Sequence, residues 1–213
     1  GDIYLSSTAN MLLNLISAPG GIVTLVAGSG SIADGNASAI NISANMADLS
    51  SYSGIGSGDP LETQVTYLKA VNGMGGGIAI DNAGALITHD DAEISTGGDI
   101  SLVAHSPLTI GALGVVSTSN GNITLTAGAS GAGATGDILT INGPVTTSGS
   151  IVLNAGNSIV GTNVPTGANV TQNANLNPPA GGGGAAVPTV PTVDQCVANP
   201  ALSGCTTVLP TLA

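Results

Sequence analysis

The first residues that could carry chemistry are two cysteines near the end of the chain. Cys196 and Cys205 are the only cysteines among 213 residues, and eight residues separate them in "CVANPALSGC". The Asn-Pro and Ser-Gly steps favour turns that bring the ends of this stretch together. In an oxidising compartment, closing a loop of about ten residues removes roughly 2.5–3 kcal/mol of unfolded-chain entropy. We expect an intramolecular disulfide between Cys196 and Cys205, with an intermolecular bond left open.

Two other uses of the cysteine pair fit the sequence poorly. Two thiolates without a histidine nearby leave zinc short of its four ligands. A Cys-x-x-Cys redox motif is absent. The pair therefore predicts a cross-link and not a metal or redox centre.

A second candidate is the acidic stretch "THDDAEIS", which holds His89, Asp90, Asp91 and Glu93. A metal or catalytic site needs these side chains to converge, but neighbours on a strand point to opposite faces. A solvated turn explains the stretch better. His105, in "VAHSPL", is interpreted as a turn residue and not as a ligand. We assign no catalytic, cofactor-binding or metal-binding residue and expect no enzyme.

The charge balance excludes several partners. Twelve acidic residues face one cation, Lys69, and the formal net charge is −11. Nucleic-acid binding requires several Lys or Arg residues to neutralise phosphates, and docking on an anionic membrane needs them too. No apolar run approaches the roughly 18 residues of a membrane-spanning helix. We expect neither nucleic-acid binding nor membrane insertion.

The composition favours an ordered chain with a thin core. Only 6% of the residues are charged, 33 are Gly, and Trp and Phe are absent. Mean hydropathy is +0.44, whereas disordered chains combine low hydrophobicity with high charge. Small and β-branched residues must fill the interior without large aromatic rings.

A short repeat then predicts the architecture. Gly, a small or polar residue and Ile precede an alternating apolar pattern of about five residues, which is typical of a β-strand after a turn. Ile-to-Ile steps of 19, 22 and 23 residues suit one coil of three short strands. Later steps of 15 and 13 residues are too short, and one explanation is that these strands lie on successive faces of one coil. The copies start at Gly1, Gly20, Gly76, Gly98, Gly121, Gly136 and Gly149.

A parallel β-solenoid explains these features better than a sandwich or barrel, because a sandwich core without Phe or Trp would be unusual. The segment Leu61 to Val71 is left open between a helical turn and a strand. A weaker option is a flat threonine face for ice binding, drawn from "NITLTAG" and "VTTSG". We divide the chain into solenoid repeats over 1–160, a flexible Gly/Pro/Asn-rich linker over 161–193 and a cysteine loop over 194–213.

At this point the residues resemble a known family. The segment "IGSGDPLETQVTYLKAVNGMGGGIAIDNAGALI" (Ile55 to Ile87) and the tail "CVANPALSGCTTVLP" are similar to filamentous-haemagglutinin-like exoproteins, the large β-helical adhesins of two-partner secretion in Gram-negative bacteria. Those exoproteins are far longer, and their N-terminal secretion domain has no counterpart here. The resemblance implies an all-β fold: a right-handed parallel β-helix followed by the linker and the small disulfide loop.

The resemblance also implies a function and a location. It suggests a non-catalytic adhesin or fibre segment at the bacterial cell surface, needing no cofactor, whose cysteine loop anchors it to an outer-membrane exporter or only staples the chain end. A host or surface receptor would be its target. The competing interpretation is a filament subunit that stacks on neighbouring copies of itself, because an uncapped coil exposes unpaired backbone groups.

Overall fold

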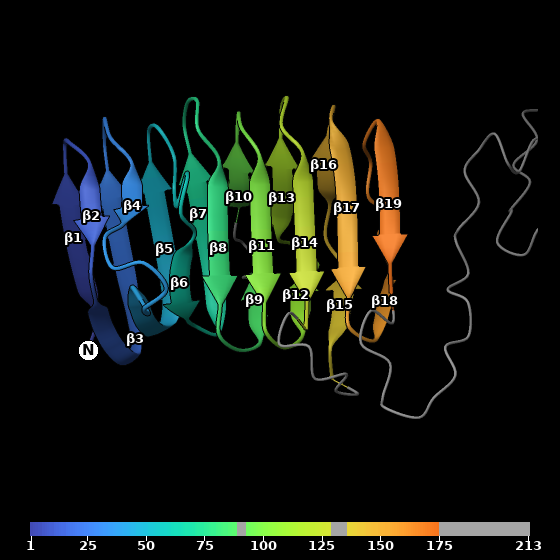
Figure 1. Ribbon diagram of the computed structural model, residues 1–213, viewed down its shortest axis with the longest axis horizontal. Helices are drawn as coiled ribbons and strands as arrows, with labels where there is room; N and C mark the ends of the chain where they lie inside the picture. The colour runs from blue at the N-terminus through green and yellow to red at the C-terminus, as the bar shows by residue number, and fades with distance from the viewer. Residues whose placement is uncertain (89–92, 129–135, 175–213) are drawn as a thin grey trace, which may run out of the picture.

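The strands stack along one axis as a solenoid of about seven turns (Figure 1). The computed structural model describes residues 1–88, 93–128 and 136–174, and these residues contain strands and turns but no helix. Each strand pairs in parallel with the equivalent strand of the next coil. The prediction of a parallel β-solenoid is confirmed, and the sandwich is excluded.

Three faces surround the core, and we name them A, B and C. Face A contains β1 (Ile3–Ser7), β3 (Ile16–Ala27), β5 (Ile42–Ser51), β7 (Tyr67–Asn72), β10 (Glu93–Thr96), β13 (Val115–Thr118) and β16 (Val145–Thr147). Face B contains β2 (Met11–Leu13), β4 (Ile32–Asp34), β6 (Leu61–Gln64), β8 (Ile78–Asn82), β11 (Ile100–Ala104), β14 (Ile123–Ala127), β17 (Ser150–Ala155) and β19 (Asn169–Asn173). Face C contains β9 (Leu86–Thr88), β12 (Leu108–Ile110), β15 (Ile138–Ile141) and β18 (Ser158–Gly161).

The strand register explains the uneven spacing of the repeat. Ile78, Ile100, Ile123 and Ile151 pair in sequence on face B, so the coil that starts at Ile123 is longer than the two before it. Ile138 belongs to β15 on face C, where β15 pairs with β12. The short steps therefore mark successive faces of one coil, as the sequence suggested. The copies at Gly1 and Gly20 lie on face A, where Ile3 pairs with Val23. Gly1 precedes β1, whereas Gly20 lies inside β3, at the register shift between Ala18 and Ile22. The motif is therefore not confined to one face and does not always mark a strand start.

The core consists of ladders of aliphatic side chains. Along face B the inward isoleucines are at most 1% exposed, and full burial of such a side chain contributes about 1.5–3 kcal/mol. This ladder contains Ile32, Ile55, Ile78, Ile100, Ile123 and Ile151. The tyrosines stay outside: Tyr4 and Tyr52 are 68% and 47% exposed, and Tyr67 is half-buried. Aliphatic ladders without Phe or Trp make up most of the interior, as the composition predicted, and buried polar side chains such as Asn72 and Asn82 lie among them.

Two segments that the sequence left uncertain form strands. Leu61 to Val71 contributes β6 and most of β7, so the helical alternative is excluded. Beyond residue 160, β19 pairs with β17 inside the segment that we expected to be a linker. Val170 continues the inward isoleucine row there, although it is 38% exposed. Strand pairing thus extends to Asn173, because an apolar residue in register is enough to continue the ladder. Residues 175–193 of the expected linker and the whole cysteine loop lie outside the described residues.

Candidate functional site

Several residues that the sequence singled out lie outside the described part of the chain. These are Cys196, Cys205, His89, Asp90 and Asp91, and the disulfide therefore stays a prediction. Glu93 begins β10, and its side chain is also outside the description. Over residues 1–88, 93–128 and 136–174, no group of three or more His, Cys, Asp or Glu side chains is arranged to hold a metal ion. The same residues form no helix long and apolar enough to cross a membrane.

His105 follows β11, in a turn as expected, but it has a partner that the sequence did not indicate. Its Nε2 lies 2.7 Å from Oδ1 of Asp81, which belongs to β8 in the preceding coil. The strand register brings the two residues together, because Ala104 pairs with Asn82. The contact joins neighbouring coils on the outside of the solenoid.

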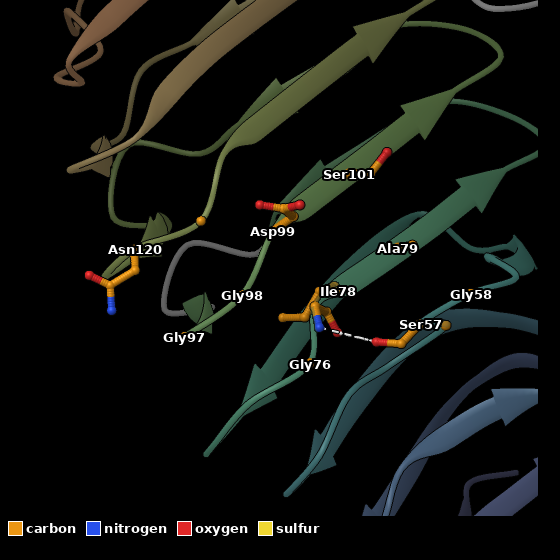
Figure 2. A pocket seen from close by; sticks show the side chains of 13 residues that line it. Ser57, Gly58, Gly76, Ile78, Ala79, Gly97, Gly98, Asp99, Ser101 and Asn120 are labelled. Atoms are coloured by element: carbon orange, nitrogen blue, oxygen red, sulfur yellow. Dashed lines mark hydrogen bonds between the residues drawn. The ribbon is translucent and has the colours of Figure 1, made fainter.

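An open groove lies at the corner between faces A and B. Its volume is about 530 Å³, and Figure 2 shows it crossing several successive coils. The floor is largely glycine backbone, and few side chains project from it. The groove is lined by Gly56, Ser57, Gly58, Gly76, Gly77, Ile78, Ala79, Gly97, Gly98, Asp99, Ser101, Asn120 and Gly121.

A ladder of glycines makes this floor, because the coils approach too closely for a side chain. A Cβ added to Gly98 or Gly121 would come within 3.0 Å of the backbone of the glycine one coil earlier. Real Cβ atoms essentially never come so close. Gly149 has the same conflict with Gly121, and a Cβ on Gly76 would overlap the backbone of Ser53. At these four positions backbone stacking requires the glycine that opens the repeat, whereas a Cβ added to Gly1, Gly20 or Gly136 would meet nothing within 4 Å.

Threonine hydroxyls on the inner side of the same corner complete the stacking. Thr118 Oγ1 donates to the carbonyl oxygen of Gly98 at 2.7 Å and accepts from the Gly121 N–H at 3.1 Å. Thr96 Oγ1 donates to the Gly76 carbonyl and accepts from the Gly98 N–H, and Thr147 Oγ1 makes the same two bonds with Gly121 and Gly149. Each hydroxyl thus links the glycine of the preceding coil to the glycine of its own coil.

The burial of these threonines argues against a flat, exposed threonine face for ice binding. Thr96 and Thr118 are 7% and 5% exposed, so this ladder faces the interior and not the solvent. On the outer surface of face B, Thr124 pairs with Ser101 and Val152. The ladder of Thr96, Thr118 and Thr147 therefore serves the corner, and no flat threonine row continues outward from Thr124. On face C, Thr109 pairs with Thr140, but Ile87 and Val160 occupy the next positions of that row.

The second residue of the repeat, usually Asp or Asn, also links the coils. Asp2 Oδ1 accepts from the Ile22 N–H at 2.9 Å, Asp99 Oδ1 from the Asn122 N–H at 2.7 Å, and Asn122 Oδ1 from the Ser150 N–H at 3.0 Å. In each case, the side chain satisfies the backbone at the same position of the following coil. The repeat Gly, Asp or Asn, Ile therefore encodes close approach, an inter-coil hydrogen bond and a core residue in three consecutive positions.

The polar groups of the groove set what it can bind. Ser57 Oγ donates to the Gly77 carbonyl at 3.2 Å and accepts from the Gly77 N–H at 3.1 Å, as Figure 2 shows. Asp99, Ser101 and Asn120 carry the other polar side chains that line the groove. The surface offers hydrogen-bonding groups on a flat backbone floor, which suits contact with an extended polar molecule. Sequence reasoning missed this groove, although the recurring glycines were its signal.

Thr118 allows a direct test of the corner. We expect Thr118→Val, which keeps the shape and removes the hydroxyl, to lower the free energy of unfolding by about 1–3 kcal/mol, because the Gly121 N–H loses its buried acceptor. Chemical denaturation followed by circular dichroism measures the change. Thr124→Val, on the outer surface, is the matched control and should stay within about 0.5 kcal/mol of the wild-type chain. Equal effects would show that the buried hydroxyl has no special role.

Comparisons with known proteins add no relative to this description. No protein-family model matches the chain, and searches of curated proteins and of solved structures find no match either.

Proposed function

We propose that the chain is a secreted, non-catalytic segment of a bacterial surface fibre or adhesin, of the filamentous-haemagglutinin-like kind that its sequence resembles. The observation that carries the proposal is the uninterrupted stack of coils. In the described part of the chain, face A alone has seven strands, which at about 4.8 Å spacing form a rod of roughly 30 Å. Such a rod holds its outer surface rigid and repetitive, which suits spacing and contact with a target.

The remaining parts of the proposal follow from the same resemblance. Parallel crossovers are right-handed in nearly all proteins, and we infer that hand here. We assign the chain to the outside of the cell, with an outer-membrane exporter as partner of the cysteine loop. Replacing both Cys196 and Cys205 by Ser should then reduce retention at the cell surface. Unchanged retention would leave the loop only as a staple of the chain end.

Adhesion can be tested on the groove at the corner between faces A and B. Beads coated with the chain should be retained on at least one member of a panel of immobilised host glycans and matrix proteins, and an Asn120→Ala/Asp99→Asn variant should lose most of this retention. Both native side chains are exposed, and the amide introduced by Asp99→Asn keeps an oxygen that can accept the Asn122 N–H. Thr109→Ala, on face C, is the control. Retention by neither chain would contradict an adhesive role.

One observation favours the alternative, a filament subunit that stacks end to end. Leu5 belongs to the same inward row as Leu25 and Leu49, but it is 42% exposed where the other two are fully buried. Leu12 and Leu15 in the same coil are 73% and 62% exposed. A neighbouring copy could cover this end. Negative-stain electron microscopy decides between the two: single rods support the adhesin segment, whereas filaments that repeat at one solenoid length support the subunit.

A further inference from the structure

A row of ionisable side chains crosses the outer surface of face B in three consecutive coils. Glu62 in β6 pairs in register with Asp81 in β8, and both side chains point outward. Two carboxylates directly opposite each other on neighbouring strands repel. Asp34 and Asp59 add further negative charge around Glu62. At neutral pH this contact between coils is therefore strained by like charges.

Burial destabilises the ionised Glu62 carboxylate in addition to the repulsion. Its Oε2 atom is buried and has no hydrogen-bond partner. Desolvation is the main cause that raises the pKa of Glu62 above 4.5, and repulsion from Asp34, Asp59 and Asp81 adds to it. The ionised form of this carboxyl group is thus the one that the folded chain accommodates poorly.

At the far side of the row, His105 meets the same Asp81. The distance from Nε2 to Oδ1 is 2.7 Å, and both side chains are a little more than one third exposed. His105 thus lies against the carboxylate that faces Glu62. The only Lys or Arg of the whole chain, Lys69, lies on face A opposite Asp48 in register. No Lys or Arg therefore offsets the negative charges on this part of face B.

We propose that the opposed carboxylates of Glu62 and Asp81 form an acid-responsive contact, which strengthens the stacking of their two coils when the pH falls from about 7.5 to 5. Protonation of Glu62 removes the charge that faces Asp81. A pair of opposed carboxylates becomes a neutral acid and a carboxylate, and Asp81 keeps its contact with His105. The inference concerns stability in mildly acidic surroundings and does not depend on the proposed adhesive role.

The sign follows from the direction of the pKa shift. A group whose pKa is raised in the folded chain contributes stability that is complete below its unfolded pKa and is lost as the pH rises through the folded value. For Glu62 the gain therefore appears on acidification towards 4.5. Hydrogen bonds from the Asn36 backbone and the Asn41 side chain lower the pKa of Asp34 below 3.8. Stability from Asp34 is lost only below that value, outside the window of the proposed contact.

The test follows the melting temperature of the whole chain from pH 7.5 to 5.0 at constant ionic strength, with EDTA present. We expect the wild-type chain to gain about 3–6 °C on acidification. Glu62→Gln should melt higher than the wild type at pH 7.5 and gain less on acidification.

A general relief of net charge must be separated from this contact. Asp48→Asn changes the net charge by the same amount on face A, away from the row, and serves as the control. It should keep the wild-type pH dependence. If Glu62→Gln and Asp48→Asn have the same pH dependence as each other, the effect belongs to the whole chain and the proposal is overturned.

Discussion

Replacing Asn82 by alanine is expected to lower the free energy of unfolding by about 3–5 kcal/mol, since several buried backbone groups lose their partners together. Asn82 is fully buried at the end of β8. Its Nδ2 donates at 3.1 Å to the carbonyl oxygens of Val65, Gly84 and Ala85. Its Oδ1 accepts from the Thr63 hydroxyl at 2.9 Å and the Val65 N–H at 3.0 Å. The side chain acts as a clamp between two coils at the corner of faces B and C.

A second substitution at this position separates the hydrogen bonds from the volume. Asn82→Asp keeps the size and the acceptor but turns an oxygen towards three carbonyl oxygens. At pH 7 we expect a loss at least as large as for alanine, because an unpaired buried charge is added. Part of the loss should return as the pH falls, since a protonated carboxyl group can donate one hydrogen bond. Urea denaturation at pH 7 and pH 5 measures both effects.

Asn154 provides the control, because it is an asparagine on the outer surface of face B. Its Nδ2 donates to Thr126 Oγ1 at 3.2 Å, and it is only half-buried. Asn154→Ala should cost less than about 1 kcal/mol. A similar loss for Asn82→Ala and Asn154→Ala would mean that water replaces the buried amide, and the clamp would have to be abandoned.

The coil could be predicted from the sequence because its signals are local. Gly before Ile marks the start of one strand in several coils, and alternation within five residues assigns the inward side chains, as in "GDISL" and "GNITL" of β11 and β14. The return of this pattern after 22 and 23 residues fixes the number of strands per coil. Local periodicity therefore determined the class of fold without knowledge of any pairing.

The inter-coil contacts could not be predicted in the same way, because they depend on register. Asn72 and Asn82 are equally polar in the sequence, and nothing local shows that both are buried. Asp81 and His105 meet only because β8 and β11 align at Ala104 and Asn82. Insertions make the coils unequal in length, so residue spacing does not give these pairs. Sequence alone singles out the acidic stretch around His89, because its titratable residues are close neighbours in the chain, whereas Asp81 and His105 are far apart in it.

A large loss of stability is also expected where the register brings two backbones together, at Gly98. We expect Gly98→Ala to destabilise the chain by about 3–5 kcal/mol or to prevent folding, because an overlap with backbone cannot be relieved by turning a side chain. The added Cβ would lie 2.6 Å from the Gly76 carbonyl carbon and still closer to its oxygen. That oxygen also accepts the Thr96 hydroxyl at 2.9 Å. Moving the two coils apart would lengthen this bond as well.

Gly97, the preceding residue in the same turn, is the matched control. A Cβ there would lie 3.9 Å from Ser119 Oγ and 4.0 Å from the Met74 carbonyl oxygen, which are ordinary contact distances. Gly97→Ala should therefore be neutral or stabilise by up to about 1 kcal/mol, because alanine reduces the freedom of the unfolded chain. Both variants are compared by denaturation midpoint and by the strand signal in circular dichroism. If Gly98→Ala folds with the stability of Gly97→Ala, close backbone approach does not explain the repeated glycine, and the glycine ladder must have another cause.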